Sequence, residues 1–461
     1  MGKNQNSKAL WVVLFMYSIV NIALLLYVKP GIHLTEGADA GSWYEPALAL
    51  LKYGSFVVLE SPETLMTYRA PLYPLYEATM LWISGGEILS IVVGQIVLLW
   101  VTGVFAGKAV GLFIPKYQVI ALSLIVFNPN ALGIAHLIQS DTLYALFIAL
   151  TVWGLLKYML SNNKLKWSLI TSIFLSVSCL VRPTGQYLIF LLPIIFPMVN
   201  ILYGHKNILK KSIINGIIGL IVSGVVLFPW MSHNEEAGWG YALVTSKIKT
   251  IYLRDSVIHA ETKDKNVSMD IASNIILKNE LKYIHSMGNR WNHMSSKDKS
   301  DELVMYYGKK LIAYPITVFL AGYIDSWIDF FGGGGSVNFH NLLSIELVKA
   351  IEKNNTEAYS SRIGAVFDSL AEAPIQAVLI SVLSYLYVIT LRVLGFFGII
   401  ELIKRKEYSF LLIIIGLITY FAITILFVGN SRYRLPVVIG FVILALYGVL
   451  FIKNTRKQKS E

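Results

Sequence analysis

The chain has 461 residues, of which 55% are hydrophobic and 15% are charged, and its formal net charge is +11. A soluble protein of this length divides into two or three domains with a far more polar surface. The apolar residues instead occur in blocks of about twenty, which is the length of helix that crosses about 30 Å of hydrocarbon. We therefore expect an all-α polytopic membrane protein.

The first apolar run, 9–28, follows a basic N-terminus and has no small-residue cleavage site after it, so we expect an uncleaved first span. Lys and Arg near span ends mark the cytoplasmic side. They cluster at Lys108 and Lys116, at Lys157, Lys164 and Lys166, at Lys206, Lys210 and Lys211, at Lys404, Arg405 and Lys406, and at Lys453, Arg456, Lys457 and Lys459. We interpret this charge as a determinant of topology and expect no nucleic-acid partner.

Placing these clusters inside gives ten spans and puts both termini in the cytoplasm. The expected spans are 9–28, 88–107, 118–135, 142–160, 166–182, 184–203, 211–231, 376–401, 408–428 and 434–452. Two further apolar stretches, 70–84 and 309–331, would reverse the parity if they crossed. We expect both to lie at the outer membrane surface or to enter it partway.

The chain then divides into three regions. Residues 1–231 form an N-terminal transmembrane module with a first external loop at 29–87, residues 232–375 form a large external region, and residues 376–461 form the last spans and a basic tail. The lone cysteine, Cys179, excludes an intrachain disulfide and a cysteine metal cluster.

The first external loop carries the residue types that proton transfer and anion binding require. Glu36 and Asp39 follow the first span, and Tyr68-Arg69-Ala70-Pro71-Leu72-Tyr73-Pro74 comes about thirty residues later. The prolines predict a rigid turn beside Arg69. A carboxylate that accepts a proton and a guanidinium that holds an anion suit one reaction at the membrane surface.

These motifs resemble the GT-C glycosyltransferases, and most closely their family 39, the protein mannosyltransferase-like and aminoarabinose transferase-like branch. Further elements agree in order along the chain. They are Ser140-Asp141-Thr142-Leu143, Val181-Arg182-Pro183, Phe228-Pro229-Trp230 with His233-Asn234, and Ser431-Arg432-Tyr433-Arg434-Leu435-Pro436. His233 stands where that family usually has Arg, and residues 240–375 match nothing in it.

The resemblance implies a GT-C-like bundle of about ten transmembrane helices with external juxtamembrane helices. It also implies a transferase that moves a sugar from a polyprenyl-phosphate donor to a lipid, protein or cell-surface glycan acceptor at the outer face of the membrane. The richness in Lys, Ile and Asn favours a bacterial plasma membrane.

In this hypothesis Asp39 is the general base of an inverting displacement, and Arg69, Arg182, Arg432 and Arg434 pair with the donor phosphate. Asp141 either orients one of these arginines, which we favour, or helps Asp39 to hold a divalent metal. An N-cap role for Asp141 is an equal alternative. Glu36, Tyr68 and His136 are supporting candidates, although a buried structural histidine and an interfacial tyrosine are the more common roles for the last two.

Two other classes of protein fit the span count. A lipid-linked glycan flippase or polymerase shares many spans and basic pockets, and a secondary transporter has paired broken helices at the bilayer midplane. The charges here lie at span ends, which favours interfacial chemistry over a lined cavity. A shared site further requires that Asp39 lie within about two side-chain lengths of at least one of Arg69, Arg182 and Arg432.

Overall fold

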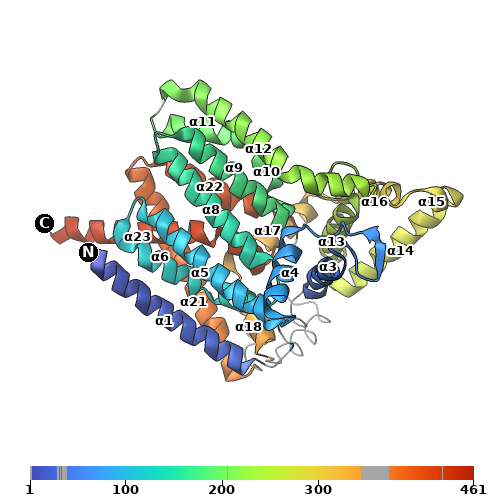
Figure 1. Ribbon diagram of the computed structural model, residues 1–461, viewed down its shortest axis with the longest axis horizontal. Helices are drawn as coiled ribbons and strands as arrows, with labels where there is room; N and C mark the ends of the chain where they lie inside the picture. Colours follow the sequence, from blue (N-terminus) through green and yellow to red (C-terminus); the bar gives the residue numbers. More distant parts are fainter. Residues whose placement is uncertain are drawn as a thin grey trace.

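The computed structural model describes residues 3–28, 31, 33, 39–204, 206–343, 373–427 and 429–460, and Figure 1 shows their arrangement. Within these residues the secondary structure is helical apart from one short antiparallel hairpin, β1 (Val57–Val58) with β2 (Ser61–Leu65). The expectation of an all-α chain is confirmed. Both termini lie at the same end of the bundle (Figure 1).

Seven segments are long and apolar enough to cross a membrane. They lie in α1 (Lys3–Tyr27), α5 (Leu89–Gly111), α8 (Asp141–Leu160), α9 (Lys164–Val181), α12 (Leu209–Glu236), α21 (Ile375–Lys404), and the 3₁₀ helix η4 (Ser431–Val437) with α23 (Val438–Ser460). Counting each bent pair of helices as one span raises the total to as many as ten.

Two of the bent pairs coincide with predicted spans. The first joins η1 (Pro115–Tyr117) and α6 (Gln118–Val126) to α7 (Pro129–Ala135), with a bend of 56°. The second joins η2 (Pro183–Gly185) and α10 (Gln186–Phe190) to α11 (Leu192–Leu202), with a bend of 63°. The shorter apolar helix α22 (Tyr408–Thr424) lies in the predicted span 408–428. A proline in the break or at the start of the next helix explains each bend, because proline cannot continue the hydrogen-bond ladder.

The stretch predicted as a peripheral helix at 309–331 is in fact two helices. α16 (Ser296–Ile312) ends before Pro315, and α17 (Ile316–Gly332) leaves at 102° to it. On α17, Ile316, Leu320, Ile324 and Ile328 are exposed at a spacing of four residues. One apolar face of this kind is typical of a helix that lies in a membrane surface.

The other peripheral stretch, 70–84, contains α4 (Leu72–Ser84), which packs against α3 (Ala40–Tyr53). Its 13 residues span about 20 Å at 1.5 Å per residue, too short to cross a bilayer. The remaining helices are η3 (Lys206–Ile208), α13 (Ser246–Lys265), α14 (Met269–Met287), α15 (Asn289–His293) and α18 (Val337–Leu342).

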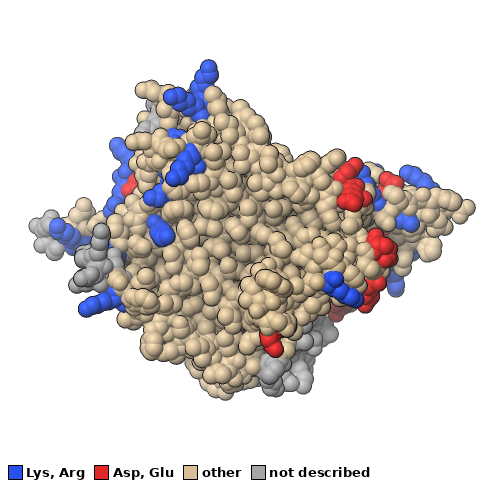
Figure 2. All heavy atoms as spheres, viewed as in Figure 1, with Lys and Arg blue, Asp and Glu red and all other residues tan. Residues whose placement is uncertain are grey.

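Charged side chains are segregated along the molecule. On the face seen in Figure 2, Lys and Arg gather at the end that carries both termini, and charges of both signs cover the opposite end over α13 to α16. A broad belt with few charges separates them (Figure 2). Such a belt is what a bilayer requires of the surface that faces lipid.

The helices α13, α14 and α16 have a small core of their own, which contains Val257, Ala260, Ile276 and Tyr307. Tyr307 donates a hydrogen bond to Glu280 at 2.5 Å. The described residues thus bury apolar side chains among α13, α14 and α16 as well as within the bundle.

Small residues allow α21 and α23 to pack closely. A Cβ added at Gly398 would lie 1.9 Å from the Leu444 carbonyl oxygen, and one added at Gly448 would lie 1.9 Å from that of Leu394. Small residues at such crossings are how helices approach one another in a membrane.

We predict that Gly448→Ala lowers the free energy of unfolding by about 1–3 kcal/mol, because the two backbones must move apart. Gly416→Ala in α22 is the matched control, since an added Cβ there meets nothing within 4 Å. Thermal melting of the purified variants in detergent measures both. Equal melting temperatures for the two variants would contradict the packing.

Candidate functional site

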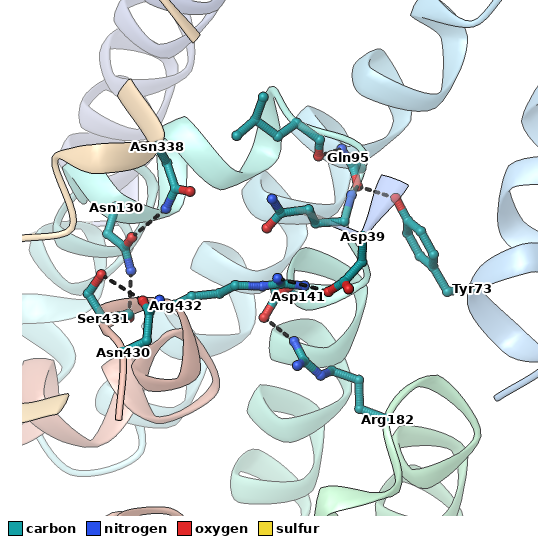
Figure 3. A network of polar contacts seen from close by, with 12 residues as sticks. Asp39, Tyr73, Gln95, Asn130, Asp141, Arg182, Asn338, Asn430, Ser431 and Arg432 are labelled. Carbon is teal, nitrogen blue, oxygen red and sulfur yellow. Dashed lines mark hydrogen bonds and ion pairs between the residues drawn. The ribbon is translucent and has the colours of Figure 1, made fainter. Parts of the chain in front are cut away.

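Five charged side chains form a continuous chain of ion pairs. Figure 3 labels four of them, Asp39, Arg432, Asp141 and Arg182. Asp39 Oδ1 pairs with Arg69 Nη2 at 3.0 Å, and Asp39 Oδ2 pairs with Arg432 Nη1 at 3.1 Å. Arg432 Nε also reaches Asp141 Oδ2 at 2.7 Å, and the other oxygen of Asp141 pairs with Arg182. We call Arg69, Asp39, Arg432, Asp141 and Arg182 the charge chain. Three guanidinium groups and two carboxylates give it a net charge of +1.

The members come from five separate segments. Asp39 is the N-cap of α3, and Arg69 lies in the turn before α4. Asp141 is the first residue of α8, Arg182 is the C-cap of α9, and Arg432 lies in η4. The structure therefore brings together four of the five residues predicted for the base and phosphate-binding roles, with Asp141, and the distance required for a shared site is met.

Local sequence explains how two of the arginines are presented. Arg182 has extended backbone (φ −144°, ψ 124°) because a residue before proline avoids the helical region, so α9 ends there. The Arg432 N–H donates to the Asn430 side chain at 2.8 Å, which fixes the start of η4. Asn130 Nδ2 donates to the Ser431 carbonyl at 2.8 Å (Figure 3).

Gly335 makes room for this contact. It has φ +80°, and a Cβ at that position would lie 2.6 Å from the Asn130 side chain. Gly335, the last glycine of the run 332–335, thus packs closely on the α7 segment.

Arg69 has two further contacts in addition to its carboxylate partner. Its Nε donates to Ser42 Oγ at 3.0 Å, and its guanidinium lies 4.4 Å from the centroid of the Trp43 ring. A guanidinium stacked on an aromatic face keeps its edge free for oxygen ligands. Ser42 and Trp43 were not predicted as site residues.

Exposure changes along the charge chain. The side chain of Asp39 is 37% exposed and that of Asp141 is 0% exposed, while Arg432 is buried between them. Burial raises the pKa of the Asp39 carboxyl, but the guanidinium groups of Arg432 and Arg69 outweigh it, and that pKa is lowered from its usual value. Asp39 is therefore ionised and accessible, whereas Asp141 has no access to a solvent-borne group.

One donor of the charge chain is left over. Arg432 uses Nε and Nη1 on the two carboxylates, and its Nη2 is buried without a hydrogen-bond partner among the described residues. An unpaired buried guanidinium nitrogen is costly, and an oxygen ligand would satisfy it.

Arg434 lies outside the charge chain. Its Nη1 donates to the Phe330 carbonyl at 2.7 Å and its Nη2 to the Gly333 carbonyl at 2.6 Å, so it caps the end of α17. Arg432 and Arg434 are only two residues apart, but the structure gives them different neighbours, and only Arg432 meets the carboxylates.

The supporting candidates are also dispersed. His136 is buried and its Nε2 lies 2.9 Å from Asn21 Oδ1, which is the structural role that a lone histidine more commonly has. Tyr68 is partly buried, with the Lys247 ammonium 6.0 Å from its ring centroid. Glu36 lies outside the described residues. The N-cap alternative for Asp141 is wrong, because Ser140 occupies that position.

The carboxylates do not fit a divalent metal. Among the residues that the structure describes, no group of three or more His, Cys, Asp or Glu side chains could hold a metal ion. Arg432 also bridges Asp39 and Asp141, which puts a positive charge where a shared cation would sit. We therefore derive no chemistry through a metal.

Gln95 is a buried polar residue that we did not predict as part of the site. It lies in α5, and its side-chain oxygen accepts from the Tyr73 hydroxyl at 2.7 Å (Figure 3). An amide inside an otherwise apolar span is itself a signal, since such residues are expensive in a membrane and need partners.

Comparison of this chain with protein families, with curated proteins and with solved structures finds no match in any of the three.

We predict that Asp141→Asn destabilises the fold more than Asp39→Asn. Removing the charge of Asp141, which is fully buried, leaves Arg182 without its carboxylate and Arg432 with Asp39 alone, which costs about 3–5 kcal/mol. The same change at the part-exposed Asp39 costs about 1 kcal/mol because water screens the pair. Thermal melting of the two variants in detergent tests this order, and equal or reversed losses would refute it.

Proposed function

We propose that this protein is a glycosyltransferase that moves a sugar from a polyprenyl-phosphate donor to a lipid, protein or cell-surface glycan acceptor. The reaction takes place at the outer face of a bacterial plasma membrane, within a GT-C-like bundle of about ten spans. The orientation follows from the basic clusters, which belong on the cytoplasmic side.

The observation that carries the proposal is the charge chain with its net charge of +1 and its unpaired Arg432 Nη2. A phosphodiester between a lipid and a sugar carries one negative charge, which this cluster would neutralise. Guanidinium groups match phosphate oxygens in geometry as well as charge. The location at the end of apolar helices suits a donor whose tail stays in lipid.

A groove on the bundle supports a lipid-linked donor. It has a volume of about 700 Å³ and is lined almost entirely by apolar side chains of α11, α21 and α22. Tyr420, one of its lining residues, donates a hydrogen bond from its hydroxyl to the carbonyl of Thr184, which lies two residues beyond Arg182. An isoprenoid chain in this groove would bring its phosphate toward the Arg182 end of the charge chain.

The mechanism assigns separate tasks to the two carboxylates. The acceptor hydroxyl or amine attacks the anomeric carbon, the bond from that carbon to the phosphate oxygen breaks, and the lipid phosphate leaves with the electron pair. Asp39 takes the proton of the acceptor. Arg69, Arg182 and Arg432 stabilise the negative charge that develops on the phosphate, and Asp141 holds Arg182 and Arg432 in place.

The donor would also make Asp39 a better base. Its lowered pKa, which weakens it as a base, results from Arg432 and Arg69. A phosphate that draws these guanidinium groups toward itself removes that stabilisation and adds a negative charge nearby, and both effects raise the pKa of Asp39.

The first test compares cells that carry the native protein with cells that carry Asp39→Asn at matched expression. We expect the variant to lose one surface sugar while the corresponding monosaccharide-lipid accumulates, as measured by mass spectrometry of polyprenyl lipids and surface glycans. Glu63→Gln, an exposed carboxylate of the same external region, is the control and should leave both profiles unchanged.

If Asp39→Asn leaves both profiles native while deletion of the whole protein changes them, Asp39 is not the base. The flippase and transporter functions would then take precedence, because neither of them forms a glycosidic bond.

The pH dependence of kcat/KM should move when Arg69 is removed. Activity requires ionised Asp39, so it falls as the pH drops through the pKa of this group, which in the native protein is lowered by Arg432 and Arg69. Arg69→Met takes away one of these charges, so the pKa of Asp39 rises and the acid limb shifts to higher pH. Lys52→Met, an exposed cation on α3, serves as the control. An acid limb that stays in place or moves to lower pH would contradict the role of Asp39.

A further inference from the structure

Side chains from other segments form hydrogen bonds with the backbone that connects α7 to α8. Residues 136–140 are not helical, although they join two apolar helices and deliver Asp141 to the charge chain. Residues 136–140 are all buried, so their backbone groups must be satisfied by the protein. Their partners therefore reveal what fixes Asp141.

Gln95 supplies three hydrogen bonds to this connection and to the last carbonyl of α7. Its Nε2 donates to the carbonyls of Ala135 at 3.0 Å and Leu137 at 2.9 Å. Its Oε1 accepts a hydrogen bond from the Gln139 N–H at 3.4 Å. His33 holds the other side of the connection, because its Nδ1 donates to the His136 carbonyl at 2.6 Å.

The same amide reaches the other half of the charge chain. Its Oε1 also accepts from Tyr73 at 2.7 Å, and Tyr73 lies in the first turn of α4, directly after the turn that carries Arg69. Tyr73 packs edge-on against Trp43 with a centroid distance of 5.4 Å, and Trp43 supports the Arg69 guanidinium. Gln95 is thus the hydrogen-bonded junction between the segment of Arg69 and the segment of Asp141.

We propose that Gln95 is a positioning residue for the transfer reaction, because it sets the distance between the Asp39–Arg69 pair and the Asp141–Arg182–Arg432 group. It touches neither substrate nor the ion pairs and acts through the 135–139 backbone and Tyr73. The inference rests on the proposed function for its effect on rate, but its effect on the site geometry does not depend on that function.

The substitutions separate positioning from folding. Gln95→Met keeps the volume and removes every hydrogen bond, whereas Gln95→Glu keeps the acceptors and, when protonated, restores one donor. Tyr73→Phe removes only the link to α4. Thr102→Val is the matched control in the same helix, since the Thr102 hydroxyl donates to the carbonyl of Leu98 one turn earlier in its own helix.

With purified protein and a polyprenyl-phosphate sugar donor, we expect Gln95→Met to lose about tenfold to hundredfold in kcat per folded molecule. Tyr73→Phe should lose less, and Thr102→Val should match the native protein. The ratio of Gln95→Glu activity to Gln95→Met activity should rise as the pH falls, because protonation returns a donor. A folded Gln95→Met protein with native kcat would overturn the proposal.

A double-mutant cycle tests the same inference without activity. If Gln95 positions Asp141, the drop in melting temperature caused by Asp141→Asn is smaller in the Gln95→Met background than in the native one. Additive drops would refute the coupling even in an active enzyme. Coupling without any sugar transfer would refute the proposed function and leave the positioning role of Gln95 intact.

Discussion

Arg432 is the side chain on which the end of the bundle that carries the charge chain depends. Arg182, Arg432 and Asp141 are largely or wholly removed from water here, and none of them could be buried alone at an acceptable free energy. Arg432 bonds to both carboxylates, so the two ion pairs become one cluster. Because its members come from α3, the turn before α4, α8, α9 and η4, the cluster requires these segments to meet at one place. The geometry of the site is therefore also a condition on the fold.

A second constraint is that broken backbone near the membrane must be satisfied by side chains. Gln95 serves the connection before α8, and Asn430 serves the start of η4. Arg434 and Arg392 donate to carbonyls at the end of α17, which belong to Phe330, Phe331 and Gly333. In the sequence these polar residues cannot be told from the members of the charge chain, because both groups are polar residues in or beside apolar runs. What distinguishes them is the partner: backbone carbonyls and N–H groups in one case, carboxylates in the other.

The sequence was sufficient for those features that depend on local pattern. Runs of about twenty apolar residues locate the long helices, and Pro71 and Pro183 mark the turns that present Arg69 and Arg182. The sequence was insufficient where the position of a side chain depends on a partner far away in the chain. Asp141 and Arg432 are 291 residues apart, and whether Arg432 or Arg434 faces the carboxylates depends on the winding of a seven-residue 3₁₀ helix. Pro315 marks the division of 309–331 in the sequence, and our prediction of a single stretch there did not use it.

The gradient of exposure along the charge chain bears on how a displacement could proceed here. An inverting attack needs a base and a leaving-group anchor on opposite sides of the sugar. Asp39 is open to an arriving acceptor, whereas Asp141 is sealed and can act only through its arginines. Arg432 spans the interval between them, with one nitrogen on each carboxylate and a third unpaired. A phosphate bound at Nη2 would occupy one corner of the guanidinium while Asp39 occupies another, at Nη1. A single guanidinium would then keep the base and the leaving group apart and also couple their charges. The rigidity of Arg432, and hence of the η4 segment and the buried Asp141 that fix it, is what such a reaction would need most.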